Sequence, residues 1–262
     1  MARRTALVTG ATSGIGAAFA RRLAAGGHDL VLVARDRDRL REQAGTLSAR
    51  HGVTVTGLPA DLTTEDGLAA VADRLAGDPV EVLVNSAGLS LNRSFLQSGP
   101  AAEERLLKLN VVAVLRLTQA ALPGMVERRH GGVVNVSSVS AFGAVMPGST
   151  YPATKAWVNN FSESVALSVR QYGVRVVALC PGYVRTEFHQ RAGVDVSRLP
   201  GWLWLDADRV AAEGLRALAR DNPVRVVDWR YRVMVATIRF APRRLVQAAT
   251  RDTRGRIGRD QA

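Results

Sequence analysis

A short apolar strand that runs into a glycine-rich turn and then a helix restricts the fold of this chain more than any other stretch. Residues 5–8 read as the strand, residues 9–16 (TGATSGIG) as the turn, and residues 17–25 as a helix that faces the core with Phe19 and Leu23. Glycines let a backbone turn tightly and approach a pyrophosphate, whose charge is met by free N–H groups and by the positive end of the helix. The spacing is G-x-x-x-G-x-G, and such a turn also occurs as a plain connection between strand and helix. The residues expected to hold a dinucleotide here are Gly10, Thr12, Ser13, Gly14, Ile15 and Gly16.

The end of the second expected strand, residues 29–34, indicates which dinucleotide would bind. An acidic residue here would accept the 2′-hydroxyl of the adenosine ribose and favour NAD, but Ala34 is neutral and Arg35 follows it. An arginine fork matches a 2′-phosphate, so we expect NADP(H) rather than NAD(H). The alternative is that Arg35 merely begins the charge-rich surface helix RDRDRLREQ.

Two further strands end in residues suited to the ligand edge of a parallel sheet. Asp61 and Leu62 follow the strand expected at residues 54–58, on the side where ligands bind in open parallel sheets, although a helix N-cap would look the same. The strand at residues 80–84 is followed by four small or polar residues, Asn85, Ser86, Ala87 and Gly88. Small residues permit a flat ligand to approach closely, but an Asn/Gly turn after a buried strand is also common without a ligand.

Residues 131–155 (GGVVNVSSVSAFGAVMPGSTYPATK) bring a serine, a tyrosine and a lysine together over a short stretch. The segment begins as a buried strand and ends in the first turn of a helix, where Tyr151 and Lys155 share one face at ~100° per residue. A nearby cation favours the phenolate, and lowering a phenol pKa from ~10 by three units needs about 4 kcal/mol. Such a tyrosine can exchange a proton with a substrate oxygen, while Ser138, at the end of the strand, hydrogen-bonds the same oxygen. By itself, Y-x-x-x-K is also common as a solvated pair on a helix.

An asparagine stands in the middle of the long apolar helix expected over residues 103–129. Asparagine is a mediocre helix former, so its presence among leucines and valines calls for a reason. We expect Asn110 to bend the helix and to hold a water.

The C-terminal third carries fewer recognisable signals. An apolar strand at residues 174–179 ends in Cys180-Pro181-Gly182, and Thr186 is placed to hydrogen-bond a ligand carboxamide. Trp202 and Trp204 belong either to a lid over an apolar site or to core packing. The remaining expected elements are a helix at 208–220, a strand at 223–228 and a helix at 229–249 that Pro242 kinks or breaks.

Composition limits the class of protein and its compartment. With 262 residues and 47% hydrophobic content, the chain suits one large α/β domain. The single cysteine, Cys180, excludes an internal disulfide and suits a reducing compartment. We find no signal-peptide apolar region and no uninterrupted apolar run of ~18 residues, so we expect a cytoplasmic protein.

Arginine supplies almost all of the net charge of +12, because the 35 basic residues include only two lysines, Lys108 and Lys155. A lysine at the motif position of such a chain favours a chemical role for Lys155. From Arg220 onward there are eleven arginines against four aspartates, which can reflect an anionic partner or only solubility. Without aromatic interleaving or a known module, no nucleic-acid partner is expected, and a weak peripheral membrane contact through residues 229–249 remains open.

Taken in order, these motifs resemble the short-chain dehydrogenase/reductase superfamily over about residues 5–190. The matching residues are TGATSGIG at 9–16, Asp61-Leu62, NSAG at 85–88, Asn110, Ser138, YPATK at 151–155, and Pro181-Gly182 with Thr186. The resemblance implies a single-domain Rossmann fold of the α/β class, with a doubly wound parallel sheet of about seven strands flanked by helices. That domain would span residues 1–250, including a substrate loop at 186–206 and the C-terminal helix at 229–249, and residues 251–262 would be a disordered basic tail.

The resemblance also implies a role for each matched residue. Tyr151 would be the acid/base, and Lys155 would lower its pKa and hold the nicotinamide ribose. Ser138 would orient the substrate carbonyl, and Asn110 would hold a water that links Lys155 to solvent. The further cofactor contacts implied are Asp61 at the adenine and Leu62, Asn85, Ala87, Gly88, Pro181, Gly182, Val184 and Thr186 along the cleft. No metal is implied, and family members usually form homodimers or homotetramers.

The expected function is therefore an NADP(H)-dependent interconversion of a carbonyl compound and an alcohol. The C-terminal segment PVRVVDWRYRVMVATIRFAPRRLV and the segment VARDRDRL are similar to the subgroup near hydroxysteroid and long-chain 3-oxoacyl reductases, which implies a lipophilic ketone or aldehyde. The alternative is a non-catalytic NADP-binding regulator or sensor on the same fold. Such a protein would be recognised by a missing Tyr, Lys or Ser of the motif, and all three are present.

Overall fold

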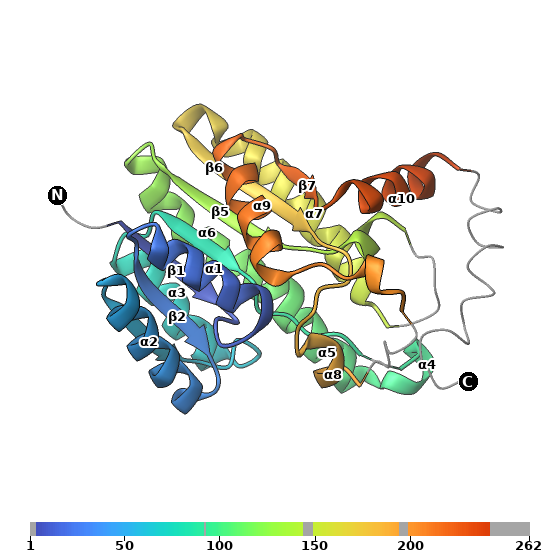
Figure 1. Ribbon diagram of the computed structural model, residues 1–262, viewed down its shortest axis with the longest axis horizontal. Helices are drawn as coiled ribbons and strands as arrows, with labels where there is room; N and C mark the ends of the chain where they lie inside the picture. The colour runs from blue at the N-terminus through green and yellow to red at the C-terminus, as the bar shows by residue number, and fades with distance from the viewer. Residues whose placement is uncertain (1–3, 92, 144–148, 194–198, 242–262) are drawn as a thin grey trace.

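Seven parallel strands form one sheet in the order β3-β2-β1-β4-β5-β6-β7 (Figure 1). The structure, a computed structural model, describes residues 4–91, 93–143, 149–193 and 199–241. The strands are β1 (Thr5–Thr9), β2 (Asp29–Ala34), β3 (Val55–Pro59), β4 (Val82–Asn85), β5 (Gly131–Val136), β6 (Val174–Cys180) and β7 (Val224–Val226). The strand order reverses between β1 and β4, and this reversal opens a crevice at the carboxyl edge of the sheet.

The central strands are apolar at nearly every position because both faces of the sheet are covered. In β1, Ala6 and Val8 pack into one hydrophobic cluster, and Leu7 between them packs into the other. All three side chains are fully buried. The continuous apolar runs seen in the sequence therefore mark strands inside a doubly covered parallel sheet, as predicted.

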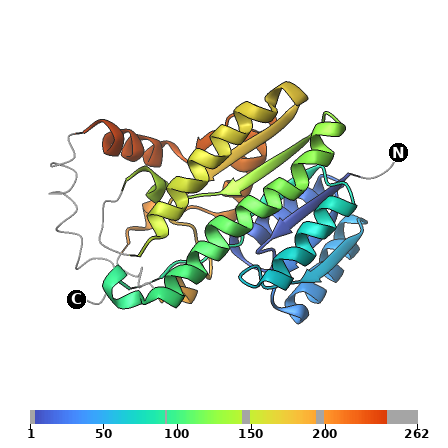
Figure 2. The ribbon, with the colours of Figure 1, turned by 180° about the vertical axis from the view of Figure 1, so that it is seen from behind.

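The helices form a layer on each face of the sheet (Figures 1 and 2). Helices α1, α2 and α9 cover one face, and α3, α6 and α7 cover the other. The helices are α1 (Gly14–Ala25), α2 (Arg37–His51), α3 (Glu65–Gly77), α4 (Phe95–Ser98), α5 (Pro100–Leu107), α6 (Ala113–Glu127), α7 (Tyr151–Val169), α8 (Phe188–Arg191), α9 (Ala207–Ala219) and α10 (Trp229–Phe240). Phe19 and Leu23 of α1 face the core, as expected from their spacing.

Two of the expected helices differ from the structure in ways that have a physical cause. The helix expected over residues 103–129 consists of α5, a π-helical stretch η1 (Lys108–Val112) that contains Asn110, and α6. The helix expected over residues 229–249 is described only as α10, which ends at Phe240, two residues before Pro242. The rest of that expected helix and the basic tail at 251–262 lie outside the described residues.

The run from Pro100 to Glu127 is long and apolar enough, by composition alone, to cross a membrane. The core helix of a soluble protein passes the same test, and this run packs on the sheet through Leu117, Ala121 and Met125. It is the only such run within the described residues.

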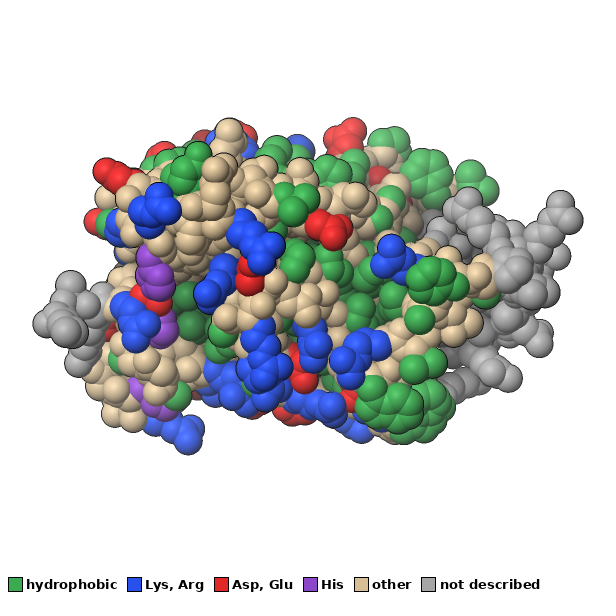
Figure 3. All heavy atoms as spheres, turned by 90° about the horizontal axis from the view of Figure 1, so that it is seen from above, with side chains coloured by type: hydrophobic (Ala, Val, Ile, Leu, Met, Phe, Trp, Pro, Cys, Tyr) green, Lys and Arg blue, Asp and Glu red, His purple; other side chains and the backbone are tan. Residues whose placement is uncertain are grey.

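Large exposed apolar side chains gather at the carboxyl edge of the sheet. Figure 3 shows the larger hydrophobic patches toward the end where α4 and α10 lie, while the histidines lie at the opposite end. The most exposed at this edge are Phe95 and Leu96 on α4, Trp202 in the short 3-10 helix η4 (Gly201–Leu203), and Trp229 and Phe240 on α10. Leu167, near the C-terminal end of α7, is also exposed. The carboxyl edge is therefore the more hydrophobic end of the molecule.

Candidate active site

The glycine turn lies at the switch point between β1 and β4, where it forms a cradle without side chains. Gly14 has a φ of 54°, and a Cβ placed on it would lie 2.9 Å from Cγ2 of Thr186. A Cβ on Gly16 would lie 2.3 Å from the carbonyl oxygen of Gly10, so α1 can begin this close to β1 only with glycine there. The cradle fits the pyrophosphate of a dinucleotide, because backbone N–H groups at the start of α1 face it and no side chain fills it.

The loop after β4 is fastened to β1 beside this cradle. The hydroxyl of Thr9 accepts hydrogen bonds from the backbone N–H groups of Ser86 and Ala87, both at 3.0 Å. The side chain of Asn85 turns inward, where its Nδ2 donates to Asn135 Oδ1 at 2.9 Å. Asn85 thus ties β4 to β5, while the loop that follows it lines the crevice with backbone and small side chains.

Ser138, Tyr151 and Lys155 converge at the carboxyl end of β5. Ser138 follows the strand and caps the short helix η2 (Val139–Phe142), where its Oγ accepts from the N–H of Ser140 at 3.1 Å. Tyr151 opens α7, and the Nζ of Lys155 lies 5.7 Å from the centre of its ring. Lys155 is 5% exposed, and its Nζ donates to the carbonyl of Val136 at 2.9 Å. The structure therefore brings together the three residues that the sequence singled out.

Burial governs the titration of the tyrosine and the lysine in this structure. It raises the pKa of Tyr151 to about 12, although the neighbouring Ser138 hydroxyl acts in the opposite direction. Burial also lowers the pKa of Lys155 to about 8. The pKa of Tyr151 is thus raised, whereas the sequence suggested a lowering by Lys155. The reason is that removing the phenolate from water outweighs the hydrogen bond from Ser138.

Asn110 occupies the π-helical stretch and connects three parts of the site. Its amide donates to the carbonyl of Leu89 at 2.9 Å and to the hydroxyl of Thr154 at 3.2 Å, and its Oδ1 accepts from the N–H of Leu89 at 3.0 Å. A Cβ built on Gly88 would lie 3.3 Å from Asn110 Oδ1 and 3.7 Å from Lys155 Nζ, which places all three residues in one cluster. The irregularity expected at Asn110 is therefore a π-turn that aims a fully buried amide at the site. The water expected there stays a prediction.

Arg35 and Asp61, for which the sequence predicts contacts with the adenosine part of a cofactor, lie near each other after β2 and β3. Burial alone would raise the pKa of Asp61, but hydrogen bonds from Thr63 and the charges of Arg105 and Arg35 lower it. The Asp61 carboxylate accepts from the backbone N–H and the hydroxyl of Thr63 at 2.9 and 2.7 Å. Thr64, and not Asp61, is the N-cap of α3, so the alternative that made Asp61 the helix cap is wrong.

Pro181, Gly182, Val184 and Thr186 lie on the loop after β6, across from the glycine turn. Val184 is buried and pairs with Leu205 in an isolated parallel bridge. The Thr186 hydroxyl accepts from the N–H of Phe188 at 3.3 Å. The ring of Phe188 stands 6.2 Å from the ring of Tyr151, centre to centre. An apolar side chain therefore forms one wall of the space in front of the tyrosine.

The two tryptophans, for which the sequence left open either a lid or core packing, have different surroundings. Trp204 packs against Tyr183, with ring centres 6.0 Å apart, and Arg185 lies over its ring at 5.6 Å. Trp202 is 60% exposed, and its carbonyl accepts from Arg230 of α10. Packing accounts for Trp204, and residues 194–198 of the expected substrate loop lie outside the described residues.

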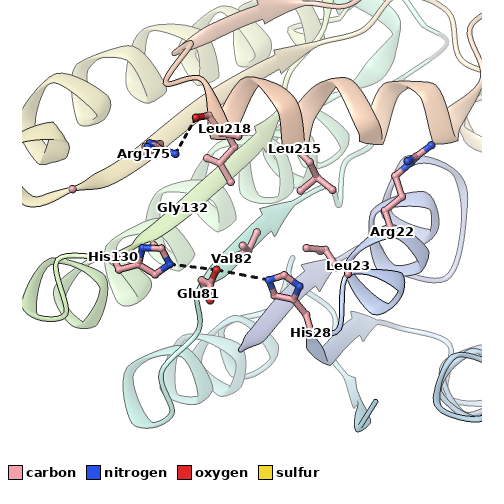
Figure 4. Close-up of a pocket in the computed structure, with 14 residues that line it drawn as sticks. Arg22, Leu23, His28, Glu81, Val82, His130, Gly132, Arg175, Leu215 and Leu218 are labelled. Carbon is pink, nitrogen blue, oxygen red and sulfur yellow. Dashed lines mark hydrogen bonds and ion pairs between the residues drawn. The ribbon is translucent and has the colours of Figure 1, made fainter. Parts of the chain in front are cut away.

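A second pocket lies at the opposite, amino edge of the sheet (Figure 4). It has a volume of about 380 Å³. The Glu81 carboxylate lies between two histidines, 3.3 Å from His130 Nε2 and 3.8 Å from His28 Nε2. Within the residues the structure describes, no cluster of three or more His, Cys, Asp or Glu has the geometry to hold a metal. This pocket shares no residue with the site at the carboxyl edge.

Sequence reasoning missed three residues around the site. Arg39 of α2 donates to Glu187 at 3.1 Å, so an ion pair joins α2 to the loop after Thr186. Thr154 receives the amide of Asn110, and Glu103 is a buried carboxylate on α5. The spacing of Thr154, one turn after Thr150 and beside Lys155, could have drawn attention to it. Glu103 was missed because its link to the site is Thr150, 47 residues away, while its other partner, Ser98, is only a local one.

Comparison with known proteins agrees with this geometry. A model of the short chain dehydrogenase family matches residues 4–196. The very-long-chain 3-oxoacyl-CoA reductase of Bos taurus is 35% identical over 186 residues, which cover 70% of this chain and 60% of the bovine protein. The chain thus spans less than two thirds of that relative's length.

Two solved structures are similar over almost the whole chain. A short-chain dehydrogenase from Sphingobium yanoikuyae in complex with NADPH is 38% identical, with a TM-score of 0.83, and the match covers 99% of this chain and 98% of that one. The bulky-bulky ketone specific alcohol dehydrogenase from Comamonas testosteroni is 30% identical, with a TM-score of 0.78, and the match covers 99% and 96%.

Proposed function

The chain belongs to the short-chain dehydrogenase family, and from this premise we propose that it is an NADP(H)-dependent enzyme that interconverts a lipophilic ketone or aldehyde and the corresponding alcohol. The family makes it an NAD(P)-dependent oxidoreductase. The observation that carries the proposal is the convergence of Ser138, Tyr151 and Lys155 at the carboxyl edge, beside the glycine cradle.

When bound, the nicotinamide supplies or accepts the hydride. In reduction, negative charge builds on the carbonyl oxygen, and the hydroxyls of Tyr151 and Ser138 hydrogen-bond that oxygen as Tyr151 gives up its proton. The carbonyl of Val136 holds the ammonium of Lys155 behind the tyrosine ring, where its charge stabilises the phenolate that proton donation leaves. Asn110 and Gly88 border the same cluster and fix the loop after β4 against it.

We propose reduction as the working direction, because NADPH is the proposed cofactor. In that direction Tyr151 is the acid, and it enters the reaction protonated, since burial raises the pKa of its phenol to about 12. In the oxidative direction the same group acts as the base.

Two arginines support NADP(H) as the cofactor. Arg35 is exposed just after β2, and its charge reaches Asp61, whose pKa it helps to lower. Arg39, one turn into α2, pairs with the exposed carboxylate of Glu187. Both guanidinium groups can meet a 2′-phosphate, whereas a ribose hydroxyl would find no carboxylate at position 34 or 35.

Apolar side chains around the site support a lipophilic substrate. Phe188 faces Tyr151, and the exposed apolar residues of α4, η4 and α10 gather at the same edge of the sheet. The names of the two relatives, a very-long-chain 3-oxoacyl-CoA reductase and a bulky-bulky ketone specific alcohol dehydrogenase, point to large carbonyl substrates in those proteins. We extend that class to this chain.

Assembly and location remain predictions of the sequence. Leu107, Val112 and Leu115, on the α5–α6 run, are partly exposed, which suits the homodimer or homotetramer expected through these helices. The exposed apolar and arginine residues of α10 suit a weak peripheral membrane contact of a cytoplasmic protein.

Replacement of Tyr151 by phenylalanine tests the proposed function. We expect turnover of a panel of 3-oxoacyl, steroid and aromatic ketones, followed by NADPH absorbance, to fall 10²-fold to 10⁴-fold, the range for loss of a general acid. NADPH binding, measured by fluorescence quenching, and the fold should be kept. Tyr172→Phe, at a tyrosine that is 38% exposed, is the matched control and should behave like the wild type. A Tyr151→Phe protein with wild-type turnover would refute the proposal, and NADPH binding without turnover of any ketone by the wild type would favour a sensor.

A further inference from the structure

Glu103 is a buried carboxylate that the proposed chemistry does not use. It is 6% exposed, near the start of α5. Its Oε1 accepts from the hydroxyl of Ser98 at 2.6 Å. Its Oε2 accepts from the hydroxyl of Thr150 at 2.6 Å and from the backbone N–H of Thr150 at 3.2 Å. Burial acts to raise the pKa of Glu103, but the bonds from Ser98 and Thr150 prevail and lower it, so the group stays ionised at neutral pH.

The contact of Glu103 with Thr150 links the carboxylate to the candidate site, because Thr150 directly precedes Tyr151 and is the N-cap of α7. An N-cap residue sets the direction in which the chain enters a helix. The Thr150 side chain does not cap α7 itself. Both of its donors, the N–H and the hydroxyl, are held by Glu103, so α5 determines where the first turn of α7 begins.

A second bridge holds the same turn one step further along. The Asn110 amide donates to the hydroxyl of Thr154 at 3.2 Å, and that hydroxyl donates to the carbonyl of Tyr151 at 2.7 Å. Glu103 and Asn110 are seven residues apart, which is close to two helical turns and places both on nearly the same side of the α5–η1 run. Hydrogen bonds therefore hold the first turn of α7 in place on both sides of Tyr151, at Thr150 and at Thr154.

We propose that Glu103 is a positioning residue for the reaction: by holding Thr150 it fixes the backbone from which the Tyr151 hydroxyl reaches the substrate oxygen. The proposal rests on the role of Tyr151 given under the proposed function. A displacement of the tyrosine hydroxyl by about 1 Å lowers the rate of proton transfer strongly while leaving the cofactor cradle untouched. Glu103 lies apart from that cradle, since Ser98 and Thr150 are its hydrogen-bond partners. Its loss should therefore change kcat and not the affinity for NADPH.

The bonding pattern also predicts which replacement preserves the function. A glutamine at this position accepts both Thr150 donors with its carbonyl oxygen and turns its NH₂ toward Ser98. The Ser98 hydroxyl accepts from that NH₂ once its single proton, which faces Glu103 in the wild type, turns to the carbonyl of Phe95, 3.1 Å from Ser98 Oγ. Glu103→Gln thus retains the bridge, whereas Glu103→Ala removes it. Glu104, an exposed neighbour on the same helix, provides the control Glu104→Ala.

The experiment measures kcat per NADPH-binding site, the Kd for NADPH and the urea midpoint for the wild type and these variants, with Tyr151→Phe beside them. We expect Glu103→Ala to lower kcat about tenfold with the Kd for NADPH within twofold, and Glu103→Gln and Glu104→Ala to stay within threefold of the wild type. Should Glu103→Ala fail to fold, Thr150→Val removes one arm of the bridge and should lower kcat about threefold at unchanged Kd.

Three results would overturn the positioning role. The first is an unchanged kcat in Glu103→Ala or, if that variant does not fold, in Thr150→Val. The second is an equal loss of kcat in Glu103→Gln and Glu103→Ala. The third is a weakening of NADPH binding in Glu103→Ala that matches its loss of kcat. A lower urea midpoint with normal kcat per folded site would show a purely structural residue and would also overturn it. Wild-type turnover in Tyr151→Phe would instead mean that the proposed function has failed, which keeps the two failures apart.

Discussion

Replacing Lys155 with methionine should make the protein more stable at neutral pH while abolishing its activity. Lys155 is almost fully buried, and burial lowers its pKa from 10.5 to about 8. The folded state therefore binds fewer protons than the unfolded state between those two values. Consequently, the stability of the wild type rises as the pH increases through this window, and the penalty for burying the ammonium is largest below it.

The size of the effect follows from the two pKa values. At pH 7 the difference of about 2.5 units corresponds to about 3 kcal/mol, at 1.36 kcal/mol per unit. Methionine fills a similar volume without a charge, but it leaves the carbonyl of Val136 without its donor, which costs about 1 kcal/mol. We therefore expect Lys155→Met to raise the free energy of unfolding by about 2 kcal/mol at pH 7. Near pH 10.5 the penalty has nearly gone, and the lost hydrogen bond should leave the variant about 1 kcal/mol less stable.

Urea unfolding without cofactor, followed by tryptophan fluorescence at pH 7 and pH 10.5, measures both differences. The chain supplies a matched control, because its only other lysine, Lys108, is exposed. Lys108→Met should change the free energy of unfolding by less than about 0.5 kcal/mol at either pH. A Lys155→Met protein that is less stable than the wild type at pH 7, or whose difference from it is the same at both pH values, would refute the argument. Such a gain in stability with loss of activity is the trade-off expected where a site keeps a group in an unfavourable environment.

Two further replacements test the cofactor end and the packing behind the site. Arg35→Ala should lower kcat/KM for NADPH about 30-fold, which corresponds to the loss of one charged hydrogen bond of about 2 kcal/mol, and should leave kcat/KM for NADH within twofold. Arg37→Ala is the control. If Arg35→Ala left the ratio of kcat/KM for NADPH to kcat/KM for NADH unchanged, the role given to Arg35 would be wrong. Gly182→Ala should lower the free energy of unfolding by about 3 kcal/mol, because its Cβ would lie 1.9 Å from the buried Tyr231 ring. Gly201→Ala is the control, because a Cβ there would meet no atom within 4 Å, and it should leave the free energy of unfolding in urea nearly unchanged. Equal effects of Gly182→Ala and Gly201→Ala would show that the Tyr231 ring moves aside.

Much of the fold could be predicted from the sequence because its causes are local. Continuous apolar runs marked the buried strands, and the spacing of Phe19 and Leu23 marked the inner face of α1. The spacing of four between Tyr151 and Lys155 predicted that both lie on one face of a helix, and the structure confirms that α7 begins at Tyr151. Periodicity and glycine placement act within a few residues, so a single chain shows them without its neighbours.

The environment of each side chain required the tertiary structure. Asn110 was noticed as an irregularity, but the π-turn and its bonds to Leu89 and Thr154 depend on segments 21 and 44 residues away. The pKa of Tyr151 was expected to fall because a lysine stands one turn away, yet burial raises it. Desolvation is set by everything packed around a group, and no spacing within one helix reveals it.

The sequence by itself thus determined the α/β fold, the glycine cradle and the serine, tyrosine and lysine of the candidate site. Only the tertiary structure decided how these residues are held. Glu103 shows the difference most clearly, since in the sequence it is one of two adjacent glutamates on a helix, and its neighbour Glu104 is exposed. The fold places Thr150, which is 47 residues away in the sequence, within hydrogen-bond distance of the Glu103 carboxylate. Glu103 is thereby hydrogen-bonded to the residue that directly precedes Tyr151. Hydrogen bonds between distant segments exist only once the chain has packed, and for this reason they leave no pattern in the sequence.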